Sequence, residues 1–157
     1  MPKITPFLWF DGQAEEAMLF YTSIFKNSKV GAVSRYGKEG PGTPGSVMTA
    51  SFTLDGQEFT ALNGGPEYKF TEAVSFYVNC KDQAEVDYFW NRLTEAGEPG
   101  PCGWLKDKFG LSWQIVPEKL TQLLQDKDPV KAGRVMQAML QMKKIVIADL
   151  EKAYAAE

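Results

Sequence analysis

Residues 11–21 read DGQAEEAMLFY, and residues 81–90 read KDQAEVDYFW. The two Gln-Ala-Glu triplets lie 70 residues apart, and the apolar pairs Leu19-Phe20 and Phe89-Trp90 keep the same spacing. Each copy follows a strand-like run, residues 3–10 or 73–79, and opens with an aspartate suited to a helix N-cap, Asp11 or Asp82. This agreement of strand, cap and helix face favours an internal duplication over two unrelated amphipathic helices.

The order of elements around each copy predicts an α+β fold made of two βαβββ units. After the first helix, residues 30–36, 47–54 and 58–62 are β-prone and bounded by glycine or proline turns. After the second helix, which ends near Gly97, only residues 102–105 and 111–116 are strand-like, so the last strand of this copy is weak or missing. We expect one domain over residues 1–157, with units at 1–66 and 70–117 and a helical tail at 118–157.

The tail has helical patterning and no strand. A short helix is expected over residues 118–125, and Asp128-Pro129 reads as a cap followed by proline at the first helical position. Further helices are expected over residues 130–142 and 145–154. Val135, Met136, Met139 and Leu140 give the middle helix an apolar face, which suits either ordinary packing, including a homodimer, or binding of a ligand or partner.

Composition excludes several classes of function. The 157 residues contain no histidine and two cysteines, which excludes a histidine-based triad, a histidine-ligated zinc site and a four-thiolate zinc site. The net charge of −3 without a basic cluster argues against nucleic-acid binding. No apolar run reaches 18 residues and the start lacks a signal-peptide pattern, so we expect no membrane partner, a cytoplasmic location and reduced cysteines.

Longer motifs lie at residues 6–12, 14–17, 20–21, 63–66, 102–117 and 136–144. These motifs resemble the PhnB-like branch of the vicinal oxygen chelate superfamily (glyoxalase, bleomycin resistance and dioxygenase proteins), in the family labelled 3-demethylubiquinone-9 3-methyltransferase. The resemblance implies a cupped mixed sheet of eight strands around a cavity, and repeats that pair in a homodimer.

The same resemblance implies where a metal would be held in metal-using members. Their late motif, a glycine followed four residues later by glutamate, corresponds here to Gly110 and Gln114, so an amide replaces the carboxylate. The two histidine positions fall near Ile4 or Thr5 and within residues 73–75, and Glu58 is an isolated carboxylate on a candidate strand. We therefore expect no metal.

The family label implies methyl transfer, but the sequence offers no recognisable site for S-adenosylmethionine. Gly64-Gly65-Pro66 follows a strand-like run without starting an amphipathic helix, as a nucleotide-binding turn would. We expect no cofactor.

A cup without metal would be lined by aromatic and amide side chains, which suit a small aromatic or apolar molecule. The resemblance implies that Gln114 faces the cup, because the position it replaces does so in metal-using members. By strand alternation, Ser112 should then share that face and Trp113 should point toward a helix. Cys102, beside Gly103 and near Lys106, is the candidate catalytic residue, with a plain turn residue as the alternative reading. The sequence thus predicts a binding protein; the alternatives are an enzyme acting in the cup, with methyl transfer implied by the label, and a pure dimer scaffold. The expected ligand-binding residues are Phe7, Trp9, Asn63, Tyr77, Trp104 and Gln114.

Overall fold

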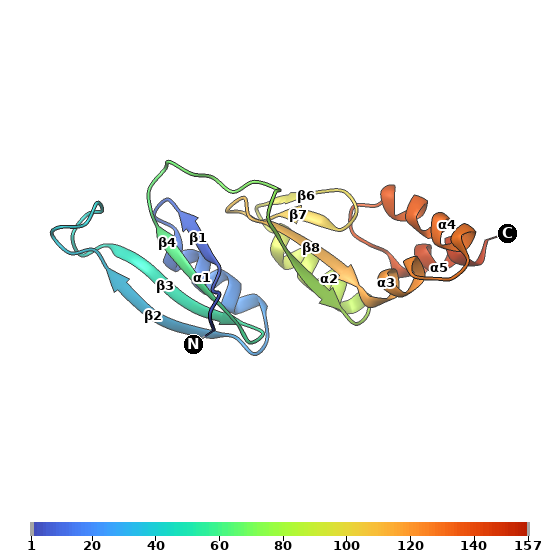
Figure 1. Cartoon of the computed structure of the whole chain (residues 1–157), viewed down its shortest axis with the longest axis horizontal. Coiled ribbons are helices and arrows are strands. Elements are labelled where there is room, and N and C mark those ends of the chain that lie inside the picture. The colour runs from blue at the N-terminus through green and yellow to red at the C-terminus, as the bar shows by residue number, and fades with distance from the viewer. Residues whose placement is uncertain (1, 157) are drawn as a thin grey trace. The chain divides into compact units, whose positions relative to one another are not determined.

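The computed structural model describes residues 2–156, which form two compact units that divide between Phe70 and Thr71. In the first unit, strands β3 and β4 form a hairpin, and β1 pairs with β4 in parallel (Figure 1). The sheet has the order β1-β4-β3-β2, and all other pairs are antiparallel. The elements are β1 (Phe7–Phe10), α1 (Ala14–Ile24), β2 (Lys29–Arg35), β3 (Val47–Leu54) and β4 (Gln57–Asn63).

One face of this first sheet is covered and the other is open. Ala50, Phe52 and Leu54 alternate along β3 and are buried with the apolar residues of α1, which packs against this strand. Phe52 stacks on Phe59 of β4 with ring centroids 5.5 Å apart. The intervening residues of β3 are only half-buried, so the second face of the sheet is available for contacts.

The second unit repeats this topology. Its sheet has the order β5-β8-β7-β6, with β5 parallel to β8. The elements are β5 (Ser75–Cys80), α2 (Gln83–Thr94), β6 (Glu98–Pro99), β7 (Trp104–Lys106) and β8 (Ser112–Pro117). The duplicated βαβββ fold with a C-terminal helical tail, as expected from the sequence, is therefore confirmed.

The sequence does not predict strand β6 of the second unit. The copy lacks no strand, because β6 directly follows α2 and pairs with β7 through Glu98↔Lys106 and Pro99↔Leu105. β6 has only two residues and no β-branched side chain, so its sequence carries no strand pattern. Pro99 is tolerated because β6 lies at the edge of the sheet.

The two helices of the repeat begin differently. Asp82 caps α2 as predicted, because its side chain accepts a hydrogen bond of 2.9 Å from the Glu85 N–H. The prediction for Asp11 is wrong: α1 starts at Ala14, whose N–H donates to Asn63 Oδ1 at 2.9 Å. Asp11 lies too far from the helix start, and the end of β4 supplies the cap instead.

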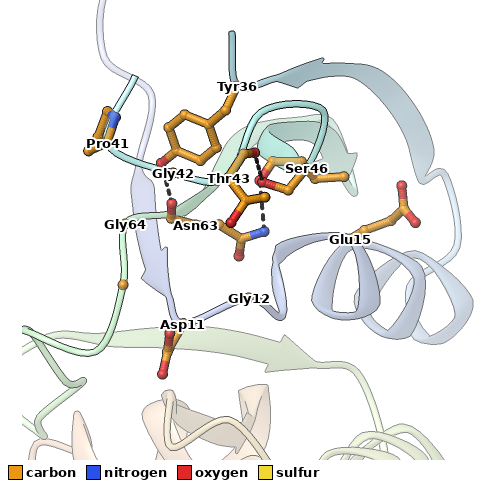
Figure 2. A pocket seen from close by; sticks show the side chains of 12 residues that line it. Asp11, Gly12, Glu15, Tyr36, Pro41, Gly42, Thr43, Ser46, Asn63 and Gly64 are labelled. Atoms are coloured by element: carbon orange, nitrogen blue, oxygen red, sulfur yellow. Dashed lines mark hydrogen bonds between the residues drawn. The ribbon is translucent and has the colours of Figure 1, made fainter. Parts of the chain in front are cut away.

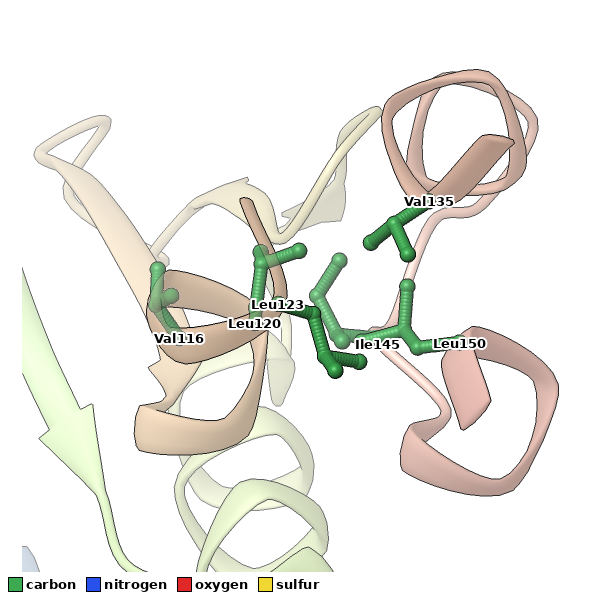
Figure 3. Packing of buried hydrophobic residues seen from close by; sticks show 6 residues of the cluster. All are labelled: Val116, Leu120, Leu123, Val135, Ile145 and Leu150. Atoms are coloured by element: carbon green, nitrogen blue, oxygen red, sulfur yellow. The ribbon is translucent and has the colours of Figure 1, made fainter. Parts of the chain in front are cut away.

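The tail consists of α3 (Glu118–Leu124), α4 (Pro129–Leu140) and α5 (Ile147–Ala155). The predicted cap is confirmed, since Asp128 accepts a hydrogen bond from the Val130 N–H at 2.9 Å. The helices enclose a small core of their own, shown in Figure 3. Its buried members are Val116, Leu120, Leu123, Val135, Ile145 and Leu150.

The predicted apolar face of α4 divides between this core and solvent. Val135 is buried and Met139 packs against the cluster, whereas Met136 and Leu140 are 40% and 55% exposed. Within residues 2–156, no helix is long and apolar enough to cross a membrane.

Candidate functional site

The open face of the second sheet brings three of the predicted ligand-binding residues together. Gln114 of β8 is paired in register with Tyr77 of β5 on one side and Trp104 of β7 on the other. Directly paired residues on one face have Cβ atoms about 5 Å apart, so these side chains are immediate neighbours. Gln114 Nε2 donates a hydrogen bond of 3.0 Å to Ser75 Oγ, which holds the amide against β5.

Trp113 lies on the other face, as the sequence predicted. It is 3% exposed, is paired with Leu105, and its indole Nε1 donates to Asp107 Oδ2 at 2.9 Å. α2 packs on this side of β7 and β8. The register of β8 therefore places Ser112 and Gln114 on the open face; that Gln114 contacts a ligand stays a prediction.

A pocket of about 450 Å³ opens beside Trp104, and we call it the Trp104 pocket. Its surface is mostly apolar, with proline, leucine and tryptophan side chains and a glycine-containing turn. It also contains Cys102, the candidate catalytic residue. The lining residues are Glu72, Glu98, Pro99, Gly100, Pro101, Cys102, Trp104, Leu105, Lys106 and Ser112.

Ser112, one of the lining residues, carries an unusual buried polar group. The residue is 1% exposed, and its hydroxyl has no hydrogen-bond partner among the described residues. A buried polar group without a partner costs about 1–3 kcal/mol, so native structures seldom contain one without a reason. Sequence alternation places Ser112 on the open face, but only the structure reveals that its hydroxyl is unpaired.

An ion pair between Lys106 and Glu72 lies at the same pocket. Hydrogen bonding to Lys106 lowers the pKa of Glu72, and the Glu72 carboxylate raises the pKa of Lys106, with a smaller contribution from Glu98. The positive charge expected to act on Cys102 is thus already engaged by a carboxylate. Cys102 itself is half-buried, with the left-handed backbone angle φ of 58°.

A second pocket, of about 420 Å³, lies in the first unit beside Tyr36 (Figure 2). Its polar groups bind one another: the Tyr36 hydroxyl donates to the Asn63 carbonyl oxygen, and Asn63 Nδ2 donates to the Val47 carbonyl oxygen at 3.1 Å. The loop at Gly42 wraps the Tyr36 ring so closely that a Cβ at this position would lie 2.4 Å from it. This pocket is therefore held by internal hydrogen bonds, and Asn63 caps α1 and ties β4 to β3 within it.

Phe7 and Trp9 lie on β1 in the first unit. Trp9 Nε1 donates to the Gly65 carbonyl oxygen at 2.8 Å, and its ring meets Tyr68 edge-on at 4.8 Å. A Cβ at Gly64 would lie 2.4 Å from the Trp9 ring, so the predicted glycine turn serves to accommodate this tryptophan. Phe7 is 63% exposed.

The described residues contain no group of three or more histidine, cysteine, aspartate or glutamate side chains placed to hold a metal ion. Glu58 lies on β4, paired in register with Thr53.

The repeated βαβββ topology defines the glyoxalase/bleomycin resistance class of folds. The family described as 3-demethylubiquinone-9 3-methyltransferase matches residues 2–116, and the chain belongs to this family. The match ends before α3, so the resemblance of residues 136–144 lies outside it. No curated protein matches the sequence.

Solved structures agree with this assignment. A putative 3-demethylubiquinone-9 3-methyltransferase, PhnB protein, from Bacillus cereus is 42% identical, with a TM-score of 0.66, over 74% of this chain and 99% of its own. A protein from Pseudomonas aeruginosa is 22% identical, with a TM-score of 0.62, over 75% of this chain and 98% of its own, and shows the fold alone. So does a variant of the fosfomycin resistance protein FosX from Listeria monocytogenes, complexed with Mn(II), which is 15% identical, with a TM-score of 0.50, over 72% of this chain and 90% of its own.

Proposed function

We propose that the protein binds a small aromatic or apolar molecule, without a metal ion, at the open face of the second sheet, in the Trp104 pocket. The observation that carries this is the unpaired hydroxyl of Ser112 in a largely apolar pocket. An apolar wall with a few placed polar groups is typical of small-molecule sites.

The side chains on this face offer a ligand two kinds of contact, apolar surface and hydrogen bonds. Trp104 and the prolines offer flat apolar surface to a ring, which favours stacked or edge-on contacts. The Ser112 hydroxyl is able to donate or accept one hydrogen bond, and Gln114 spends one N–H on Ser75 and keeps its carbonyl oxygen for a ligand. A ligand with one hydroxyl or amide beside an aromatic body would satisfy both groups, because its O–H or N–H donates to the Gln114 carbonyl oxygen and its oxygen accepts from the Ser112 hydroxyl.

The absence of metal is part of the same proposal. Its support is the amide of Gln114, a neutral and poorer ligand for a divalent cation than a carboxylate, in a chain that has no histidine.

The test is a set of small aromatic fragments screened against the labelled protein by NMR. Fragments that bind should shift the backbone amides around Tyr77, Trp104 and Gln114 in a saturable way. Shifts confined to the Tyr36 pocket, or no shifts with any fragment, would overturn the proposed site.

The Ser112→Ala variant should change stability and ligand affinity in opposite directions. Removing an unsatisfied buried hydroxyl should raise the free energy of unfolding by about 1 kcal/mol and weaken fragments that hydrogen-bond there. Ser51→Ala is the matched control, since Ser51 lies on the corresponding strand pair of the first unit, in register with Thr60. A stabilised Ser112→Ala variant with unchanged fragment affinity would contradict the assigned role.

The second candidate is methyl transfer, which the family description favours. It requires S-adenosylmethionine to bind, so calorimetric titration of this cofactor distinguishes the two. Saturable binding of S-adenosylmethionine would favour a methyltransferase. Heat no greater than that of dilution would favour a binding protein without this activity.

We also propose a cytoplasmic homodimer. The support for the dimer is the exposed apolar side chains on α4, at Val130, Met136 and Leu140. Light scattering at micromolar concentration should give twice the chain mass of 17.5 kDa, and Leu140→Glu should reduce it to the mass of one chain.

A further inference from the structure

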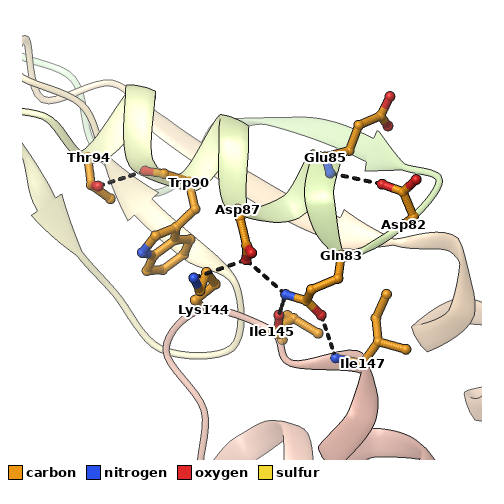
Figure 4. A network of polar contacts seen from close by, with 9 residues as sticks. All are labelled: Asp82, Gln83, Glu85, Asp87, Trp90, Thr94, Lys144, Ile145 and Ile147. Carbon is orange, nitrogen blue, oxygen red and sulfur yellow. Dashed lines mark hydrogen bonds and ion pairs between the residues drawn. The ribbon is translucent and has the colours of Figure 1, made fainter.

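The tail is attached to the second unit by the short segment 142–147, which we call the tail clamp. It runs from the end of α4 to the start of α5. The side-chain amide of Gln83, at the start of α2, binds it twice: Nε2 donates to the Ile145 carbonyl oxygen at 2.9 Å, and Oε1 accepts from the Ile147 N–H at 2.7 Å (Figure 4). Asp87, one turn further along α2, pairs with Lys144 at 3.0 Å.

The same clamp holds the loop that borders the Trp104 pocket. The Cys102 N–H donates to the Met142 carbonyl oxygen at 2.8 Å, and the Gly103 N–H donates to the Lys143 carbonyl oxygen, also at 2.8 Å. The Gly103 carbonyl oxygen in turn accepts from the Ile115 N–H of β8 at 2.8 Å. The pocket loop is therefore bonded to the sheet on one side and to the tail on the other.

Packing reinforces these hydrogen bonds at Gly103. A Cβ there would lie 3.1 Å from Ile145 Cγ1 and 2.9 Å from the Ile115 carbonyl oxygen, and φ is 85°. Ile145 is completely buried and belongs to the hydrophobic cluster of the tail. Displacement of the clamp would thus remove both the hydrogen bonds and the apolar support of residues 102–103.

Among the described residues, the glutamine at the corresponding position of the first unit does not bind another segment of the chain in this way. Gln13 is the counterpart of Gln83 at the 70-residue spacing, but it is exposed and makes no capping hydrogen bond from its side chain. The clamp itself belongs to the part of the chain beyond the family match, which ends at residue 116.

We propose that docking of the tail through residues 142–147 controls the Trp104 pocket, so that release of the clamp frees the loop at Cys102 and weakens ligand binding. By linkage, a ligand in the pocket strengthens the docking of the tail by the same factor. The effect on ligand affinity rests on the proposed function, whereas the hold of the clamp on the loop does not.

Gln83→Ala tests the hold directly, with Gln13→Ala as the matched control. Gln83→Ala removes the two hydrogen bonds to the clamp and a third, of 3.0 Å, from Gln83 Nε2 to Asp87 Oδ1. Their loss should speed hydrogen exchange of the Cys102 and Gly103 amides about tenfold or more, through local opening. Exchange in β3 and β4 of the first unit should stay unchanged, and Gln13→Ala should change neither. Lys144→Met, which removes only a partly exposed ion pair, should give a smaller increase at the same two amides.

The two cysteines provide a second readout in the unmodified protein. Cys102 borders the pocket, whereas Cys80 is buried and burial raises the pKa of its thiol to about 12. Pulse labelling with 5,5′-dithiobis(2-nitrobenzoic acid), with mass spectrometry to locate the adduct, should therefore report clamp opening at Cys102 and unfolding at Cys80. In Gln83→Ala, labelling at Cys102 should accelerate about tenfold while Cys80 stays unlabelled.

Unchanged exchange and labelling at residues 102–103 in Gln83→Ala would overturn the control of the loop by the tail. Equal acceleration at both cysteines would overturn it too, because the variant would then unfold as a whole. In the fragment screen, affinity should fall in Gln83→Ala and not in Gln13→Ala. If no fragment binds the wild type, the proposed function fails, while exchange and labelling still decide the hold of the clamp on the loop.

Discussion

Replacement of Asp107 should be among the most destabilising changes in the second unit. Asp107 is 3% exposed, and its carboxylate accepts hydrogen bonds from three donors in the β7–β8 turn and at the start of β8. Oδ1 accepts from the Phe109 N–H at 2.9 Å and the Leu111 N–H at 3.1 Å, and Oδ2 accepts from Trp113 Nε1 at 2.9 Å. Asp107 therefore organises this turn.

The expected cost follows from the donors that each substitution leaves unpaired. Asp107→Ala strands the buried N–H groups of Leu111 and Trp113, at about 1–3 kcal/mol each, so a loss of about 3–5 kcal/mol is expected. Asp107→Asn retains an oxygen for the backbone donors but turns an N–H₂ group toward the indole N–H, for a loss of about 2 kcal/mol. Asp55→Asn, in the exposed β3–β4 turn, is the control and should stay within about 0.5 kcal/mol of the wild type.

Urea unfolding followed by circular dichroism measures these differences. With a denaturant slope of about 2 kcal/mol/M, the midpoint should fall by about 1 M in Asp107→Asn and about 2 M in Asp107→Ala. In a double-mutant cycle, Trp113→Phe should recover about 1–2 kcal/mol of the Asp107→Asn loss, because the competing donor is gone. Asp107→Asn as stable as Asp55→Asn would refute the reasoning.

Further expectations concern other parts of the chain. Asn63→Ala removes the cap of α1, so the free energy of unfolding should fall by about 1–2 kcal/mol in urea titrations, and an undiminished midpoint would contradict the capping role. Gln114→Leu should weaken fragments that contact the amide by about 1–3 kcal/mol in NMR titrations while leaving purely apolar fragments unaffected. The Tyr154 hydroxyl, 2.7 Å from Asp126, lowers the pKa of that carboxyl, which stabilises the fold above the ordinary carboxyl pKa and ceases to do so as pH falls through the lowered value. The stability difference between the wild type and Tyr154→Phe should accordingly shrink on acidification through this range, and a carboxyl NMR titration should show the pKa of Asp126 rising in the variant.

The features of the fold that the sequence predicted are those with local periodicity or a strong cap. The pattern within each copy of the repeat, the register that separates Trp113 from Gln114, and the caps at Asp82 and Asp128 all depend on residues close together in the chain. β6 was not predicted because its two residues are too few to show the alternation of apolar and polar side chains that marks a strand. The cap of α1 was not predicted either, because it comes from Asn63, 49 residues after the helix start.

The candidate site was predictable only in part for the same reason. Residue type indicated Tyr77, Trp104 and Gln114 as ligand-binding candidates, and the strand pairing in the structure makes them neighbours on one face. No sequence pattern reports that a hydroxyl such as that of Ser112 lacks a partner, because this depends on every group around it. The attachment of the tail to Cys102 and Gly103 is made through backbone groups, which leave no trace in residue identity.

From the parallel pairing of β1 with β4 we expect a particular order of assembly of the first unit during synthesis. A parallel pair cannot be closed by a tight turn, so β1 leaves the ribosome about fifty residues before its only neighbour in the sheet exists. The β3–β4 hairpin, joined by the short turn at Asp55-Gly56, is able to form as soon as it emerges, and β1 then joins its free edge. We therefore expect the strand of the first unit that is made first to be incorporated last, and the same sequence of events for β5 when β8 is made.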